Sequence, residues 1–212
     1  IKEILVTHQD TDHVGAIEEG SNELFSDATI YIGKVENEYL EGHKHRKVFW
    51  GLTTLPQVVI DNQKVLIEDG QVFYIGNIKV EAILVPGHTW GHLVYLIDDS
   101  YLFTGDTIWF GADGGYAFLN TLAEDRKLQC QSLQRLKEIL VKRNLQLKII
   151  TGHTGWTDDF AFAFAHIDEI CNSLKRKPKV HDPKAPFDGF DESEDTEENA
   201  RNGYLAQCYK VI

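Results

Sequence analysis

The chain has 212 residues and a formal net charge of −12 at pH 7. Hydrophobic residues make up 42% and charged residues 25%, a globular composition that excludes wholesale disorder and fibrous repeats. No apolar run is long enough to cross a bilayer, and the negative charge disfavours a polyanionic partner. We therefore expect neither a membrane nor a nucleic-acid partner.

The negative charge is concentrated near the C-terminus. Residues 181–200 hold eight acidic residues and one base, Lys184. A charge run of this kind is typical of a solvated surface segment. We expect a folded domain over residues 1–180, followed by an acidic segment over residues 181–212.

Cysteine usage and the start of the chain give two further expectations. Cys130, Cys171 and Cys208 are widely spaced and odd in number, which supports neither a disulfide framework nor a thiolate zinc site and favours the cytoplasm. The chain begins at Ile1 and contains no methionine, so we expect it to start inside a longer protein.

The first half of the chain reads mainly as strands. Residues 4–6 form a short apolar run that ends at a Thr-His pair, and residues 14–25 place apolar side chains at helical intervals. Residues 33–55 have no clear pattern. Further strands are predicted at residues 28–32, 64–67, 71–75, 78–85, 93–97 and 101–104.

The second half predicts a helix at 124–143, a buried strand at 145–150 and a second helix at 159–177 that contains His166. Strands followed by helix, strand and helix predict an α+β fold with helices outside the sheets. The glycine-rich stretch 110–116 predicts a loop that could wall a site, and the His-rich stretch 42–47 predicts a solvated loop.

Histidine and aspartate follow apolar strands at four places. The segments are Thr7-His8-Gln9-Asp10-Thr11-Asp12-His13, Pro86-Gly87-His88-Thr89-Trp90-Gly91-His92, Thr104-Gly105-Asp106 and Thr151-Gly152-His153. In an extended segment alternate residues share a face, so we expect His8, Asp10 and Asp12 to converge and His13 to turn away. Each segment alone is weak evidence, but imidazole and carboxylate together are the ligands that hold paired divalent cations.

In this order the four segments resemble the metallo-β-lactamase superfamily, whose signature is His-x-His-x-Asp-His followed by His, Asp and His. The segments around His88 and Asp106 are most similar to the branch of glyoxalase II and general metal-dependent hydrolases. The resemblance covers residues 1–155 and implies an αββα sandwich with a dinuclear site at one edge. It also implies strands before the first motif, and only seven residues precede His8, so we expect the N-terminal strands to lie outside this sequence.

The resemblance implies a role for each ligand. His8, Asp10 and His88 would hold the first metal, Asp12, His13 and His153 the second, and Asp106 would bridge both. Asp12 would also orient the nucleophile, and His92 would orient a ligand without touching metal. Phe103, Trp109 and Phe110 would pack rather than contact substrate.

Asp10 departs from the signature, which has histidine at that position. The four positive charges of two divalent cations are balanced by Asp10, Asp12, Asp106 and a bridging hydroxide, whereas a histidine at position 10 would leave one positive charge. The extra carboxylate therefore favours iron or manganese relative to an all-imidazole zinc site, and flavodiiron proteins carry a carboxylate there too. The alternative is that Asp10 is an unliganded loop residue.

These expectations combine into one hypothesis with three alternatives. The hypothesis is a hydrolase that uses two divalent metal ions, zinc first and iron or manganese next, to cleave a small ester, thioester or lactone. The alternatives are a diiron redox protein with a separate electron donor, a nucleic-acid phosphodiesterase, and a non-catalytic scaffold. We expect a small-molecule substrate, no other cofactor-binding residues, and keep a homodimer as an open alternative.

Overall fold

The computed structural model describes residues 1–20, 23–119 and 121–170. The predicted acidic segment at 181–212 and the last part of the predicted helix at 159–177 lie outside these residues. Within the described part of the chain, no helix is both long and apolar enough to cross a membrane.

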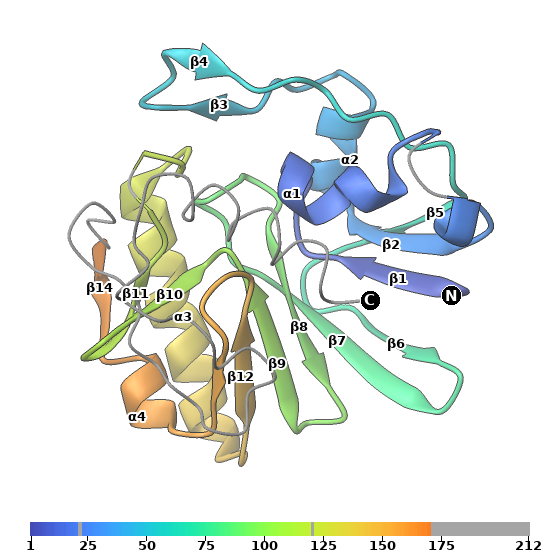
Figure 1. Cartoon of the computed structure of the whole chain (residues 1–212). Helices are drawn as coiled ribbons and strands as arrows, with labels where there is room; N and C mark the ends of the chain where they lie inside the picture. Colours follow the sequence, from blue (N-terminus) through green and yellow to red (C-terminus); the bar gives the residue numbers. More distant parts are fainter. Residues whose placement is uncertain (21–22, 120, 171–212) are drawn as a thin grey trace, which may run out of the picture. The chain divides into compact units, whose positions relative to one another are not determined.

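The first sheet is parallel and has the strand order β1-β2-β5 (Figure 1). Ile30 and Ile32 on its central strand are fully buried, and they pack in one cluster with Val14, Ile17 and Leu40. Short helical elements therefore cover the outer face of this sheet. The elements are β1 (Glu3–Val6), β2 (Thr29–Gly33), β5 (Lys64–Ile67), α1 (Thr11–Val14), η1 (Gly15–Ile17), η2 (Glu23–Phe25) and α2 (Lys34–Leu40).

The second sheet has the strand order β13-β12-β9-β8-β7-β6 (Figure 1). Neighbouring strands from β6 to β9 are antiparallel, as the predicted turns between them require, whereas β9 and β12 are parallel. The strands are β6 (Val72–Ile75), β7 (Ile78–Leu84), β8 (Leu93–Ile97), β9 (Tyr101–Gly105), β12 (Lys148–Thr151) and β13 (Trp156–Thr157).

Helix α3 (Arg126–Arg143) covers the outer face of the second sheet. The side chain of Asp125 accepts a hydrogen bond from Leu128 N at its start, and Asn144 ends it in the left-handed conformation. Leu133 and Leu136 are buried against strand residues such as Leu102. The predicted apolar stripe is therefore the face that packs on the sheet.

The two sheets pack face to face. Ile67 of the first sheet shares a buried cluster with Val80 and Tyr95 of the second, and the Tyr95 hydroxyl donates a hydrogen bond to Val6 O. The order of layers is thus helix, sheet, sheet and helix, which confirms the predicted α+β sandwich.

Smaller elements correct two predictions. The glycine-rich stretch at 110–116, predicted as a loop, belongs to a hairpin of β10 (Ile108–Gly111) and β11 (Gly114–Ala117). The predicted helix at 159–177 is wrong over its described part, because α4 (Phe160–Ala163) is followed by β14 (His166–Ile170), which pairs with β11. A side chain at Gly115 would collide with the backbone of Ala163, so glycine permits this close approach, and tertiary pairing overrides the helical periodicity.

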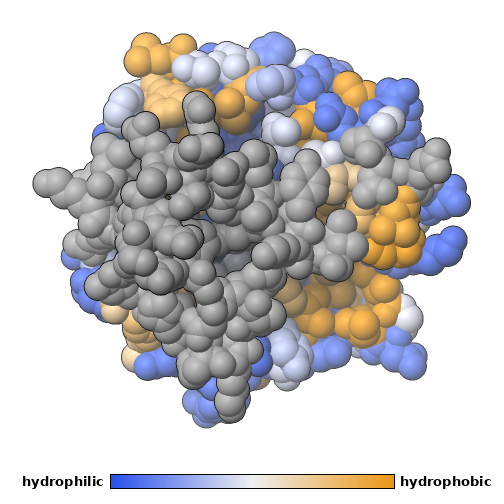
Figure 2. Space-filling model, viewed as in Figure 1, coloured by the Kyte–Doolittle hydropathy of each residue, from blue (hydrophilic) through white to orange (hydrophobic). Residues whose placement is uncertain are grey.

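The structure also changes the prediction for residues 14–25 and assigns elements to the stretch at 33–55, which had no clear pattern. The helical pattern at 14–25 is realised only as the short elements α1, η1 and η2. The unassigned stretch at 33–55 contains α2 and a hairpin of β3 (Lys47–Val48) and β4 (Thr53–Thr54). Apolar residues gather on the surface over this hairpin (Figure 2), where Trp50 and Leu52 are exposed.

Candidate metal centre

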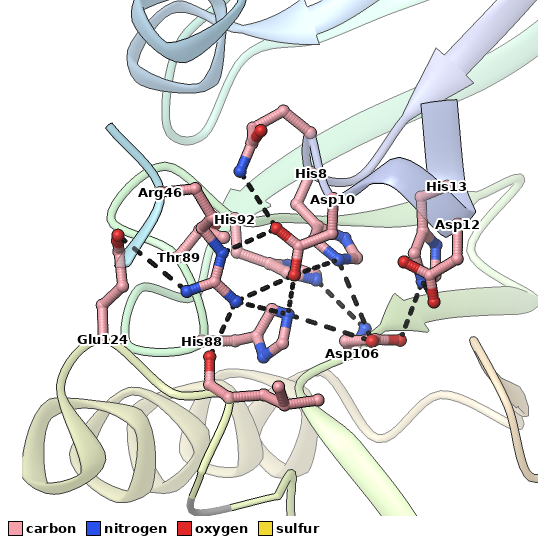
Figure 3. Close-up of polar contacts among 12 residues, drawn as sticks. His8, Asp10, Asp12, His13, Arg46, His88, Thr89, His92, Asp106 and Glu124 are labelled. Carbon is pink, nitrogen blue, oxygen red and sulfur yellow. Dashed lines mark hydrogen bonds and ion pairs between the residues drawn. The ribbon is translucent and has the colours of Figure 1, made fainter. Parts of the chain in front are cut away.

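Chain segments that follow strands meet at one end of the sandwich. His8 follows β1, His88 lies between β7 and β8, Asp106 lies between β9 and β10, and His153 follows β12. His8, His88 and Asp106 are almost completely buried. Figure 3 shows the side chains of the first three segments pointing toward one another. The structure therefore brings together all the segments that the sequence singled out.

Helix α1 corrects the predicted geometry of the first segment. Asp10 is extended and caps α1, and its carbonyl oxygen accepts hydrogen bonds from His13 N and Val14 N. Because the helix starts at Thr11, Asp12 and His13 no longer alternate as they would in a strand. His13 consequently faces the centre beside Asp12, with its Nε2 atom 3.6 Å from Asp12 Oδ2.

One group of side chains, called site 1, contains His8, Asp10, His88 and Asp106. The Oδ2 atom of Asp10 lies 3.8 Å from His8 Nε2 and 3.1 Å from His88 Nε2. The Oδ2 atom of Asp106 lies 3.9 Å and 3.8 Å from the same two nitrogens. The ligand atoms of His8, His88 and Asp106 all lie within 4.8 Å of one another. Asp10 is not part of that compact group and joins it through its contacts with the two imidazoles.

A second group, called site 2, contains Asp12, His13, Asp106 and His153. His13 Nε2 lies 3.2 Å from Asp106 Oδ1 and 3.3 Å from His153 Nε2. His153 Nε2 lies 3.2 Å from Asp12 Oδ2 and 3.1 Å from Asp106 Oδ2. Asp106 belongs to both groups, as a bridging carboxylate must.

These spacings fit divalent cations. Zinc bonds of about 2.0–2.1 Å in tetrahedral geometry place neighbouring ligand atoms roughly 3.3 Å apart, close to the separations within site 2. In site 1 the Nε2 atom of His8 is buried and has no hydrogen-bond partner among the described residues. A buried nitrogen without a partner is costly unless another group, such as a cation, satisfies it.

The electrostatics of the centre also favour positive charge. Burial opposes ionisation of Asp106, yet the charges and hydrogen bonds of His13 and His153 hold its pKa well below the usual value. Burial lowers the pKa of His153, but the hydrogen bonds that its ring donates to Asp106 and Asp12 outweigh this effect and raise that pKa to about 10. The carboxylates therefore retain protons on nearby imidazoles, and a cation can take the place of those protons.

Two glycines make room for the carboxylate of Asp106. A side chain at Gly152 would collide with Asp106 Oδ1, and one at Gly105 would lie 2.7 Å from both His92 Nε2 and Thr7 Oγ1. Gly105 also has a positive φ of 51°. The Thr-Gly-Asp and Thr-Gly-His segments therefore need glycine for close packing around Asp106.

His92 supports the centre from behind. Its side chain is fully buried and its Nε2 atom accepts a hydrogen bond from Asp106 N at 3.1 Å. Burial and the neighbouring His88 hold the pKa of His92 well below the usual value, so the ring stays neutral and can accept this bond. This contact fits the predicted orienting role, although it fixes the backbone of Asp106 rather than a ligand side chain.

Arg46 is a site residue that the sequence interpretation missed. It lies in the stretch at 42–47 that was predicted to be a solvated loop, yet its side chain is only 2% exposed. Its Nε and Nη2 atoms donate to Asp10 Oδ1 at 2.6 Å and to Asp10 Oδ2 at 2.8 Å. Its neighbours His45 and Lys47 are exposed, as predicted. Of these three residues, only Arg46 contradicts the predicted exposure to solvent.

Glu36 is a second buried group that the sequence did not single out. Its carboxylate accepts hydrogen bonds from Gln9 N, Thr89 Oγ1 and Gly91 N, and it thereby ties the first and second ligand segments together. Burial raises the pKa of Glu36 to about 7 despite these donors. A lone buried glutamate in a helix carries no sequence motif that would have revealed it.

The aromatic residues near Asp106 differ in their surroundings. Phe110 is buried in the core, as predicted, whereas Phe103 is 40% exposed on β9. The rings of Trp109 and Phe118 lie 6.3 Å and 5.7 Å from the ring of His153. Trp109 is partly exposed beside site 2, whereas Phe118 is buried and also lies 5.0 Å from the ring of His88 in site 1.

A helix–sheet–sheet–helix sandwich with imidazoles and carboxylates gathered at one end points to a class of metal-dependent proteins. The family model described as the metallo-beta-lactamase superfamily matches residues 1–153. The chain belongs to the metallo-β-lactamase superfamily.

Curated relatives are named as hydrolases. The chain is 30% identical over 151 residues to the probable polyketide biosynthesis zinc-dependent hydrolase BaeB of Bacillus velezensis, covering 71% of this chain and 56% of the relative. It is 29% identical over 185 residues to the hydroxyacylglutathione hydrolase of Pelagibacter ubique, covering 87% of this chain and 64% of the relative. The chain thus spans less than two thirds of the length of either relative.

Solved structures share the fold. The chain aligns with the crystal structure of TTHA1623 in a di-iron-bound form with a TM-score of 0.52 and 24% identity, covering 73% of this chain and 71% of the other. At this identity the likeness supports the shared sandwich alone.

Proposed function

We propose that this chain carries the active site of a hydrolase that cleaves a small ester, thioester or lactone with two divalent cations. The observation that carries the proposal is the convergence of His8, His88 and Asp106 in one group and of Asp12, His13, Asp106 and His153 in another, with Asp106 in both. The names of the curated relatives, a zinc-dependent hydrolase and a hydroxyacylglutathione hydrolase, support hydrolysis and zinc.

The ligand roles follow from the two groups. His8, Asp10 and His88 would hold a cation in site 1, Asp12, His13 and His153 would hold one in site 2, and Asp106 would contact both. Bound divalent cations would polarise the substrate carbonyl oxygen and lower the pKa of a water so that it attacks near neutral pH.

The ligand side chains of site 2 are more exposed to solvent than those of site 1, which indicates that the substrate approaches site 2. The side chains of Asp12, His13 and His153 are 26%, 16% and 12% exposed. Those of His8 and His88 are fully buried. Substrate and water therefore reach the centre over site 2, beside the partly exposed Trp109. Asp12 is the most exposed of these ligands, which suits it to orient the attacking water.

The test combines metal analysis with a substrate panel. The purified chain, loaded with zinc, manganese or iron, is assayed on an aryl ester, a thioester, a lactone and an aryl phosphodiester. We expect bound metal and hydrolysis of at least one carboxylic substrate, with loss of both after Asp106→Ala. Hydrolysis that is unchanged by Asp106→Ala would overturn the proposal and support the scaffold alternative.

The diiron redox alternative rests on Asp10, a carboxylate where the superfamily signature has histidine. Absorption spectra of the iron-loaded chain under air decide it. An oxygen-sensitive absorption band together with no hydrolysis would favour the redox alternative. Zinc or manganese with hydrolysis would end it. The nucleic-acid alternative predicts salt-dependent RNA binding, which we do not expect from a chain with a net charge of −12.

The remaining expectations are part of the same proposal. We infer a small-molecule substrate, with no nucleic-acid or membrane partner, and a cytoplasmic setting in keeping with the unpaired spacing of the cysteines. A homodimer stays an open alternative, which sedimentation equilibrium would test.

A further inference from the structure

Asp10 and Arg46 form a buried ion pair at the edge of site 1 (Figure 3). The two side chains meet through two parallel hydrogen bonds, of 2.6 Å to Asp10 Oδ1 and 2.8 Å to Asp10 Oδ2. The side chain of Arg46 is 2% exposed and that of Asp10 is 9% exposed. A bidentate guanidinium–carboxylate pair fixes both the position and the plane of the carboxylate.

The two carboxylate oxygens of Asp10 have different surroundings. Oδ1 also accepts a hydrogen bond from Gln9 Nε2 at 3.0 Å, so its donors lie on the protein side. Oδ2 faces His8 and His88 across the centre of site 1. Oδ2 is therefore the oxygen of Asp10 that a cation in site 1 would meet, and it lies beside Arg46 Nη2, which is also 3.3 Å from His88 Nε2.

Arg46 is itself held from several directions. Its Nη1 atom donates to Lys47 O at 3.0 Å, and its Nη2 atom donates to Leu122 O at 2.7 Å. Glu124 lies 3.9 Å from Nη1, and this carboxylate also accepts hydrogen bonds from the Tyr39 hydroxyl and Trp90 N. Arg46 is thus held in one position, and of the two acids near it, Asp10 is the one to which it donates hydrogen bonds.

The pair changes the charge of site 1. Counted without Arg46, the carboxylate of Asp10 adds one negative charge and favours harder cations. Arginine remains protonated at every pH of interest, so its positive charge cancels that of Asp10 at contact distance. Together the two side chains present an uncharged ligand, as a neutral imidazole would.

We propose that Arg46 is a positioning residue that makes the Asp10–Arg46 pair a neutral ligand equivalent to a histidine, and that the pair thereby keeps site 1 suited to zinc. This inference rests on the proposed metal centre. It predicts that the residues at positions 10 and 46 are coupled in metal binding, since a histidine at position 10 needs no guanidinium beside it.

The experiment is a double-mutant cycle read by metal binding without substrate. Zinc affinity is measured by chelator competition for the wild type, Asp10→His, Arg46→Met and the combined variant. In the background with Arg46, we expect Asp10→His to lower the affinity for one of the two zinc ions roughly tenfold or more. In the Arg46→Met background, the same substitution should lower that affinity less than about threefold. An equal loss in both backgrounds would overturn the proposal.

Metal preference supplies a second readout. Arg46→Met leaves the charge of Asp10 uncompensated, so the ratio of manganese to zinc affinity should rise roughly tenfold. Arg46→Lys keeps the positive charge and should hold this ratio within about threefold of the wild type. A tenfold rise in Arg46→Lys would contradict the charge argument, and this variant also serves if Arg46→Met does not fold.

Arg143→Met is the matched control. Arg143 forms a bidentate pair with Glu81, with both hydrogen bonds at 2.6 Å, and its loss should leave zinc affinity unchanged. If the wild type binds zinc at both sites but cleaves no substrate in the panel, the proposed function fails while this inference stands. If the wild type binds no zinc, both fall.

Discussion

The imidazoles of His13 and His153 approach to 3.3 Å between their Nε2 atoms, although 140 positions separate them in the sequence. Asp106 lies between the two segments, 3.2 Å from His13 Nε2 and 3.1 Å from His153 Nε2. Like-charged imidazolium rings would repel each other, so this carboxylate, or a cation with neutral rings, is needed to hold them together.

Asp106→Asn should therefore weaken both sites at once. The amide keeps the shape of the side chain but removes the negative charge that sites 1 and 2 share. We expect both zinc affinities to fall by roughly a hundredfold or more, because even outer residues of metal sites contribute 10–100-fold. Asp61→Asn, at an exposed position, is the control. Two unchanged zinc steps in chelator competition would contradict the bridging role.

Gly152→Ala should disturb the centre through shape alone. Its Cβ atom would overlap Asp106 Oδ1, so the carboxylate or the loop must move. We expect zinc affinity to fall by roughly tenfold. The control is Gly15→Ala, where the added Cβ would have Thr11 Cγ2 as its nearest neighbour at 3.7 Å. If both variants bind zinc like the wild type, the close packing around Asp106 does not matter for binding.

Removing metal should destabilise the fold. Ligands of the two sites come from the loops after β1, β7, β9 and β12, so bound cations link both sheets. At zinc concentrations a hundredfold above the dissociation constant, linkage predicts about 2.7 kcal/mol of added stability per site. Urea unfolding with and without chelator measures this difference. For Asp106→Asn, the free energy of unfolding should differ little with and without chelator. A wild type whose free energy of unfolding does not change when chelator is added would argue against metal binding.

Glu36 predicts a pH dependence of the metal-free chain. Burial raises its pKa from 4.5 to about 7 in the folded state. Between these values the unfolded chain has lost the proton that the folded chain keeps, so the free energy of unfolding falls as pH rises. The contribution is about 3 kcal/mol, present below pH 4.5 and lost by about pH 7. Urea unfolding from pH 4.5 to 7.5 should show a shallower fall for Glu36→Gln. Parallel curves would show that Glu36 does not titrate in this range.

Short-range patterns predicted much of this structure. The strands β7, β8 and β9 are joined by tight connections, so turn residues and apolar runs mark them in the sequence. Helix α3 has both an amphipathic stripe and a capping aspartate, and its position was close to the prediction. The ligand segments were found because each follows a strand.

Long-range contacts explain what the sequence did not reveal. β14 exists because it pairs with β11, and nothing between residues 159 and 170 records that partner. Arg46 is surrounded by exposed polar residues in the chain and is buried only because Asp10 and Leu122 O receive its guanidinium. The helical position of His13 depends on where α1 begins, which a pattern of alternating ligands does not fix.

The positions of bound cations can be measured directly by anomalous scattering from crystals of the zinc-loaded chain. We predict two peaks that share Asp106 as a ligand, one completed by His8, Asp10 and His88 and the other by Asp12, His13 and His153. Peaks on other residues, or no peak at this end of the sandwich at saturating zinc, would contradict the account.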